Sequence, residues 1–340
     1  MATIHSSTRG SFPDPPRHTS GGGTAVRRPP PHRGTLTRVF AGIRVTAAAA
    51  AMSLSAPGPA TVEAANAPAR IVSLVPAVTE TLFAIGAGPR VVGVSTFCDF
   101  PEQVVSLPRV GSFVAPVAEA IVALSPDLVI TSPTPGNQPA VRAIERAGVR
   151  IAVVRSEGGL AEAKAAIRDV ASAAGVAAAG ADLVAHLEAE LEATSASVQG
   201  LARPRVAVVV GRDPLVLAGP ESYLGELVAI AGGTNVASGL RGRWPRVGHE
   251  FLIENAPEVI IDLTIAMAGE GTAQSAQSAW NDHPAIPAVA AQRVYPSSDR
   301  ATGDAVMLLR PGPRLARACS LLAGWIHPAR APRPQPGEQQ

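Results

Sequence analysis

Residues 119–130 read EAIVALSPDLVI, and residues 250–261 read EFLIENAPEVII. Each stretch opens on a glutamate, reaches a proline seven positions later, and continues with an acidic residue and an apolar run. The pattern predicts a short helix followed by a buried strand in both places. Arg-Val-Gly precedes both stretches, at Arg109 and Arg246. This repeated order indicates two α/β lobes built on one plan.

Apolar, β-branched runs alternate with helical patterns over most of the chain, which is typical of mostly parallel sheets. The exception is the span from about 159 to 200, which carries no strand signal and predicts a helix over 160–174 and a longer one that ends near 199. One stripe of the longer helix holds Val184, Leu187, Leu191 and Val198. We therefore expect an α/β fold of two similar lobes, with mostly parallel central sheets, that flank one helical span.

The sequence predicts five segments. They are a disordered extension with a signal peptide (1–67), an amino-terminal α/β lobe (68–158), a helical span (159–202), a carboxyl-terminal α/β lobe (203–328) and a disordered tail (329–340).

The first segment has the parts of a secretory signal. Residues 1–67 carry seven arginines and two acidic residues, a net charge of +5, and the short apolar run 45–54 precedes small-residue sites. The sequence predicts export to the periplasm, with cleavage near Ala64–Ala67. No cysteine lies near that site, so a lipoprotein is not expected. A disordered extension on a cytoplasmic protein and a mis-assigned start are the alternatives.

Composition and motifs exclude several functions. The 340-residue chain has a net charge of +2, so the part after residue 67 carries −3, which gives a nucleic-acid partner no electrostatic basis. The two cysteines, Cys98 and Cys319, build no disulfide framework or metal site. Phosphate-binding, dinucleotide-binding, nucleophile-elbow and metalloprotease motifs are all missing. We expect no enzyme activity, no cofactor and no resident metal.

Aromatic residues among turn formers are the main sign of a binding site. They are Phe97, Phe113 and Trp244, and each follows or interrupts the expected strands where core packing does not require it. Ligands of open α/β sheets bind beyond the carboxyl ends of the strands. Aromatic side chains with a few polar groups suit a large, flat, partly apolar ligand.

The sequence resembles the periplasmic solute-binding proteins of the helical-backbone class, which serve ABC importers of cobalamin, haem and ferric siderophores. The likeness covers about residues 69–327 and lies in RIVSLVPAVTE (70–80), GVSTFCDFP (93–101), EAIVALSPDLVI (119–130), GPESYLGE (219–226) with AGG (231–233), and WPRV (244–247). The FCDFP and WPRV stretches are most similar to the cobalamin-binding branch.

The resemblance implies two α/β lobes joined by a long rigid helix, with a ligand cleft between the lobes. It also implies a set of functional residues. The implied ligand contacts are Ala77, Phe97, Phe113, Trp244 and Arg300, with Asn137 and Asp213 nearby. A tryptophan is common in that branch at the position of Phe113, and another aromatic near Ser132, and this chain departs at both. Glu119 and Glu250 take the family's permease-docking role, one acid per lobe, although a carboxylate in a first helical turn also favours the helix dipole.

The expected function is therefore the capture of cobalamin or a related corrinoid and its delivery to a membrane permease and its ATPase. A haem- or ferric-siderophore-binding protein of the same class is the alternative, and an α/β enzyme acting in the cleft is a third hypothesis. Haem would need an axial Tyr, His or Met. An anionic siderophore would need several arginines, for which Arg212, Arg243 and Arg300 are candidates. No transmembrane span is expected in the mature protein.

Overall fold

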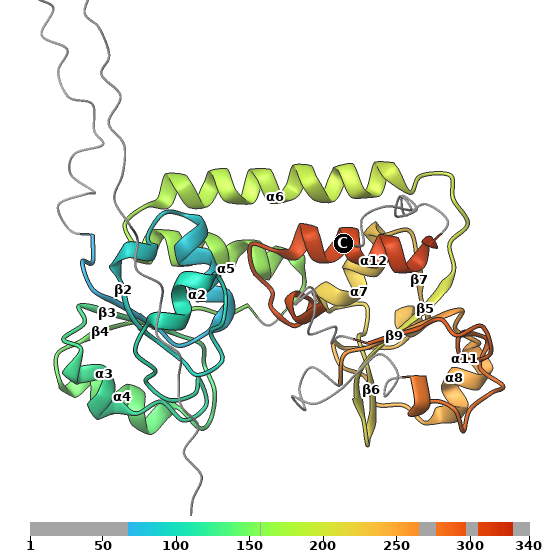
Figure 1. Ribbon diagram of the computed structural model, residues 1–340, viewed down its shortest axis with the longest axis horizontal. Helices are drawn as coiled ribbons and strands as arrows, with labels where there is room; N and C mark the ends of the chain where they lie inside the picture. Colours follow the sequence, from blue (N-terminus) through green and yellow to red (C-terminus); the bar gives the residue numbers. More distant parts are fainter. Residues whose placement is uncertain (1–66, 157, 265–276, 297–304, 329–340) are drawn as a thin grey trace, which may run out of the picture. The chain divides into compact units, whose positions relative to one another are not determined.

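Two sheets with mostly parallel strands form the framework of the protein (Figure 1). The structure is a computed structural model and describes residues 67–156, 158–264, 277–296 and 305–328. The strand orders are β2-β1-β3-β4 and β6-β5-β8-β9, with β7 also paired to β5. These sheets confirm the expected pair of α/β lobes. The expected signal peptide before residue 67 and the expected tail after residue 328 lie outside the described residues.

The amino-terminal lobe is built on a four-stranded parallel sheet. Apolar β-branched runs form its strands, and β1 and β3 at its centre are fully buried. The elements are β1 (Ile71–Ser73), α2 (Pro76–Ala84), β2 (Val91–Val94), α3 (Ala118–Ala123), β3 (Leu128–Thr131), α4 (Gln138–Arg146) and β4 (Arg150–Val153). The strand order changes direction between β1 and β3, and because the strands are parallel, the loops that follow both strands leave the same carboxyl edge of the sheet.

The carboxyl-terminal lobe repeats this plan with one added hairpin. Its elements are β5 (Arg205–Arg212), β6 (Leu215–Leu217), α7 (Tyr223–Ile230), β7 (Thr234–Asn235), α8 (His249–Asn255), β8 (Val259–Asp262), α11 (Pro287–Ala290), β9 (Val294–Pro296) and α12 (Leu315–Ile326). The sequence did not predict β6. Asp213 and Pro214 make a two-residue turn that lets β6 pair antiparallel with β5, so Asp213, named above beside the implied ligand contacts, lies at the tip of a hairpin.

In the amino-terminal lobe, the repeated sequence forms a joint between helix α3 and strand β1. The Asp127 carboxylate accepts the backbone N–H of Arg70 at 2.9 Å, and the Arg70 guanidinium donates to the carbonyl of Leu124 at 2.7 Å. Ser125, just before the proline, has a left-handed φ of 46°. The joint fixes where α3 ends relative to the sheet.

The carboxyl-terminal lobe has the same joint between α8 and β5. The Glu258 carboxylate accepts the backbone N–H of Arg205 at 3.0 Å, and Arg205 Nε donates to the carbonyl of Ala256 at 2.8 Å. Ala256, just before the proline, has a φ of 43°. The two repeats therefore share their hydrogen bonds and their backbone conformation as well as their sequence pattern.

The helical span consists of α5 (Leu160–Ala173) and α6 (Ala177–Ser197). At 21 residues, α6 is ~32 Å long. Its predicted apolar stripe is buried, and α6 packs against α5 and α12 (Figure 1). Helix α5 contributes to both cores, because Leu160 and Ile167 pack with the carboxyl-terminal lobe and Ala166 and Val170 pack with the amino-terminal lobe.

Both cysteines are buried as free thiols. Cys98 belongs to the loop that carries Phe97, and its Sγ lies 3.1 Å from Thr79 Oγ1 and 3.2 Å from Ser95 Oγ. Burial raises the pKa of the Cys319 thiol to about 12, so this side chain stays neutral at physiological pH. Both behave as small packing residues. In the described ranges, none of the helices is both long and apolar enough to cross a bilayer.

Candidate functional site

An aromatic pair lies at the carboxyl edge of the amino-terminal sheet, with Phe97 exposed and Phe113 half-buried. Phe97 follows β2 and is 52% exposed, and Phe113 lies beside it with ring centroids 5.6 Å apart and planes tilted by 60°. This tilted geometry is favourable for two aromatic rings. The pair presents an apolar surface next to the strand ends, which is where the sequence analysis expected a ligand.

Asn137 ties the loops behind this pair together. Its side chain is buried, and Nδ2 lies 2.8 Å from the carbonyl of Ser132, 3.2 Å from that of Phe113 and 3.3 Å from Thr131 Oγ1. The amide hydrogens are thus directed at the protein itself, and they fix the backbone on which the Phe113 ring stands. A direct ligand contact by Asn137 stays a prediction.

Ala77 lies in the first turn of α2 and is 6% exposed. Gly312 approaches it so closely that a β-carbon on that glycine would lie 3.2 Å from the Ala77 β-carbon. The predicted ligand contact at Ala77 is therefore largely covered by the segment that precedes α12.

Trp244 is the exposed aromatic of the carboxyl-terminal lobe, with 42% of its surface accessible. Its neighbours are held by backbone bonds, because Gly219 N donates to the Arg243 carbonyl at 2.8 Å and Leu217 N to the Pro245 carbonyl at 3.0 Å. The segment lies along β6 as an irregular edge. A tryptophan with a fixed backbone and an exposed ring suits the anchor role that the sequence predicted.

The sequence did not indicate a buried carboxylate, that of Asp262, at the carboxyl ends of β5 and β8. Asp262 is inaccessible to solvent, and its Oδ2 accepts bonds from Arg212 Nε at 2.7 Å and from Trp280 Nε1 at 2.8 Å. Its Oδ1 accepts from the Thr264 hydroxyl at 2.6 Å. Arg212 is partly exposed and is held at the strand ends by this pair. Asp213, the predicted contact beside it, is exposed at the hairpin tip.

The two candidate docking acids occupy equivalent places. Glu119 is in the first turn of α3 and Glu250 is in the first turn of α8, and both are exposed. An exposed aliphatic residue follows each acid three positions later, Val122 at 37% and Ile253 at 45%. Residues three apart share one face of a helix, so each lobe presents an acid beside an apolar side chain. Arg300 lies outside the described residues.

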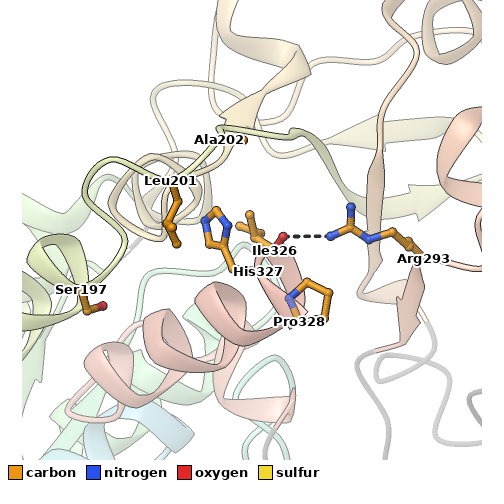
Figure 2. Close-up of a pocket in the computed structure, with 7 residues that line it drawn as sticks. All are labelled: Ser197, Leu201, Ala202, Arg293, Ile326, His327 and Pro328. Carbon is orange, nitrogen blue, oxygen red and sulfur yellow. Dashed lines mark hydrogen bonds between the residues drawn. The ribbon is translucent and has the colours of Figure 1, made fainter. Parts of the chain in front are cut away.

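Figure 2 shows a separate hollow of about 620 Å³ near the end of α12. Its lining consists of Ser197, Leu201, Ala202, Arg293, Ile326, His327 and Pro328. Arg293 donates to the carbonyls of Ile326 at 2.8 Å and Trp325 at 3.2 Å, so its guanidinium caps the helix. None of the predicted ligand contacts within the described ranges lines this hollow.

Two α/β lobes joined by a helical span define a two-lobed solute-binding protein. The chain belongs to the periplasmic binding protein family, whose model matches residues 71–301. The vitamin B12-binding protein of Vibrio campbellii is 29% identical over 224 residues, which are 65% of this chain and 80% of that protein. The periplasmic haem-binding protein RhuT of Roseiflexus sp. RS-1 is 30% identical, with a TM-score of 0.65 over 76% of this chain and 98% of that one.

A third relative corrects one expectation. YvrC of Bacillus subtilis, an uncharacterised ABC transporter substrate-binding lipoprotein, is 27% identical over 267 residues, covering 77% of this chain and 81% of that protein. The expectation of a free periplasmic protein that is not a lipoprotein is wrong on this comparison, because this relative is a lipoprotein. The comparisons confirm the class, and the chain is a substrate-binding protein of an ABC importer.

Proposed function

We propose that the chain binds cobalamin or a related corrinoid and delivers it to its permease. The observation that carries this proposal is an exposed aromatic ring at a strand end or edge in each lobe, Phe97 beside the half-buried Phe113 in one and Trp244 in the other. Rigid aromatic faces bind large flat ligands at a low cost in side-chain ordering. The vitamin B12-binding relatives support a corrinoid as the ligand.

Haem is the second candidate, and the similarity to RhuT favours it. Haem iron needs an axial side chain. Tyr223 is buried and donates its hydroxyl to the Leu308 carbonyl at 2.8 Å, and burial raises its pKa above the usual range. Tyr295 is stacked on Trp325 with centroids 5.4 Å apart. His249 is stacked on His283 at 4.4 Å. These contacts occupy the three candidate axial side chains, which supports the proposal of a corrinoid over haem.

A ferric siderophore is a weaker fit. A ligand of high negative charge would need several available guanidinium groups, and Arg212 is already neutralised by the buried carboxylate of Asp262.

Calorimetry and absorption spectroscopy with cyanocobalamin, haemin and a ferric siderophore test the choice of ligand. We expect saturable one-to-one binding of cyanocobalamin and weaker binding of the other two. A haemin complex with a shifted Soret band, together with no cyanocobalamin binding, would transfer the assignment to haem.

We also propose that the chain binds its ligand without transforming it and holds no resident cofactor. Its relatives by sequence are named for substrate binding in transport. No group of three metal-ligating side chains occurs within the described ranges. Mass spectrometry of ligand recovered after long incubation should return it unaltered, and a changed mass would indicate an enzyme.

Glu119 and Glu250 are the proposed docking residues for the permease. The support is their equivalent placement, one in the first turn of a short exposed helix in each lobe. Basic side chains on the permease would complement both acids, and removing one partner of an ion pair buried at an interface costs about 2–5 kcal/mol.

A further inference from the structure

A buried carboxylate of the amino-terminal lobe is paired with two arginines from the carboxyl-terminal lobe. Glu80 lies in α2 with its side chain 1% exposed. Arg314 donates from Nε at 2.8 Å and from Nη2 at 2.6 Å, and Arg310 donates from Nη1 at 3.1 Å. An unpaired carboxylate here would be very costly, so the two guanidinium groups are what allow its burial.

Arg310 reaches beyond Glu80 to the loop that carries Phe97. It donates to both carboxylate oxygens of Asp99, one of them at 2.8 Å, and to the carbonyl of Phe97 at 3.3 Å. The Arg314 guanidinium lies 4.1 Å from the centre of the Phe100 ring. The segment before α12 therefore holds this loop by charge, by a backbone hydrogen bond and by a cation–π contact.

Electrostatics favours a persistent contact between Arg310 and Asp99. Burial alone would raise the pKa of Asp99, but the hydrogen bond and charge of Arg310 outweigh burial and hold that pKa below its ordinary value. Burial likewise opposes the charged form of Arg310, but Asp99 and Glu80 outweigh it and raise the pKa of the guanidinium. Both partners stay charged at any pH at which the protein would work.

We infer that Arg310 is a positioning residue for ligand capture, which holds the Phe97 ring in its binding orientation from the opposite lobe. Arg310 contacts the Phe97 carbonyl and the Asp99 side chain, whereas the exposed Phe97 ring is left to face the ligand. This inference rests on the proposed function, because it requires Phe97 to contact the ligand. It makes the aromatic surface of one lobe depend on the other lobe.

The loop has a second support from its own lobe. Arg109 donates to the carbonyls of Ser95 and Cys98, and Thr96 N donates to the Gly111 carbonyl at 2.9 Å. Loss of Arg310 should therefore loosen the loop without unfolding it. The expected effect is a wider range of Phe97 orientations and a higher entropic cost of binding.

The test compares Arg310→Gln, Arg310→Lys and the control Arg142→Gln, since Arg142 is an exposed arginine of α4. Amide hydrogen exchange of residues 96–100 should be about tenfold faster in Arg310→Gln, and cyanocobalamin affinity about tenfold lower. Arg310→Lys should recover part of both because it keeps the charge, and Arg142→Gln should match the wild type.

A double-mutant cycle separates positioning from a general loss of stability. In a Phe97→Ala background, Arg310→Gln should change affinity by less than about twofold, because its effect passes through the ring that has been removed. Full additivity of the two losses would refute the inference, and so would unchanged exchange in the loop.

Asp99→Asn is the second variant if Arg310→Gln does not fold. It removes the charged contact to the loop while leaving Glu80 paired with Arg314 and Arg310, and the Asp99 side chain is 63% exposed. It should show the same direction of change in exchange and affinity. If the wild type binds neither cyanocobalamin nor haemin, the proposed function fails, whereas wild-type binding that is unaffected in these variants overturns the inference alone.

Discussion

Trp244 is the residue on which the proposed ligand site depends most in the carboxyl-terminal lobe. Its backbone is fixed along β6 and its ring is 42% exposed. Apolar surface removed from water contributes about 25 cal/mol per Å², so a tenfold effect, ~1.4 kcal/mol, needs only part of the ring face. We expect Trp244→Ala to weaken cyanocobalamin binding at least about tenfold by calorimetry. Trp244→Phe should lose much less, and an unchanged affinity in Trp244→Ala would remove this residue from the site.

Asp99 should give the folded state a pH-dependent contribution. Its pKa is lowered on folding, because the hydrogen bond and charge of Arg310 outweigh burial. Such a carboxyl stabilises the folded state above its unfolded pKa, near 3.9, and loses that contribution as the pH falls through the lower folded pKa. The difference in unfolding free energy between wild type and Asp99→Asn should be constant above about pH 5 and shrink below about pH 4. Urea titrations across this range measure it, and a difference that grows with acid would contradict the assignment.

At the scale of elements, the two short helices α3 and α8 should act in transport and not in ligand affinity. Each is fixed to its sheet by the same arginine and carboxylate joint, so Glu119 and Glu250 are held in matching places. Glu119→Ala or Glu250→Ala should reduce uptake through the cognate importer, and the double change to arginine should abolish it by repulsion. Ligand affinity of the isolated protein should stay within about twofold, because neither acid is placed among the aromatic contacts. If the folded double arginine variant still supports full uptake, the docking role is wrong and both glutamates only stabilise the starts of their helices.

Elements defined by local pattern could be predicted from the sequence. The repeat located α3 and α8 because acid, apolar run, proline and strand lie within twelve residues, and the apolar stripe located α6 because its period is that of a helix. Strand β6 was missed because its three residues are too few to show a period, and because Asp213 and Pro214 are typical of loops as well as hairpin turns.

The arginine and carboxylate contacts of the site could not be predicted in the same way. Glu80 and Arg314 lie 234 positions apart, and Asp262 receives Arg212 from a neighbouring strand 50 positions away. Ion pairs between residues so far apart in the sequence depend on how the sheets and helices pack. In the sequence itself these arginines stand near prolines, in positions that are typical of exposed loops. The resemblance predicted Phe97 and Trp244 as contacts, but nothing in it indicated what holds the loop of Phe97.

For the whole molecule, we expect only a small closure on ligand binding. The Glu226 carboxylate of α7 accepts the backbone N–H of Leu160 at the start of α5, and the Tyr223 N–H donates to the Gly158 carbonyl at 3.0 Å. Together with Glu80 and its two arginines, these bonds oppose a wide hinge. Scattering curves of the free and ligand-bound protein should nearly superimpose, and a marked fall in the radius of gyration would show that the lobes swing.

The dual packing of α5 has a consequence for how the protein melts. Six of its buried side chains are divided between the two cores, three to each, so neither core can lose its structure while the other keeps a complete set of neighbours. We therefore expect one cooperative thermal transition, with a calorimetric enthalpy equal to the van't Hoff enthalpy, although chains of two lobes often show two transitions. A cavity made in α5 by Ile167→Ala should lower the single melting temperature without splitting the peak. Differential scanning calorimetry of the wild type and Ile167→Ala measures the number of transitions. A resolved second peak in either protein would show that the two halves unfold independently.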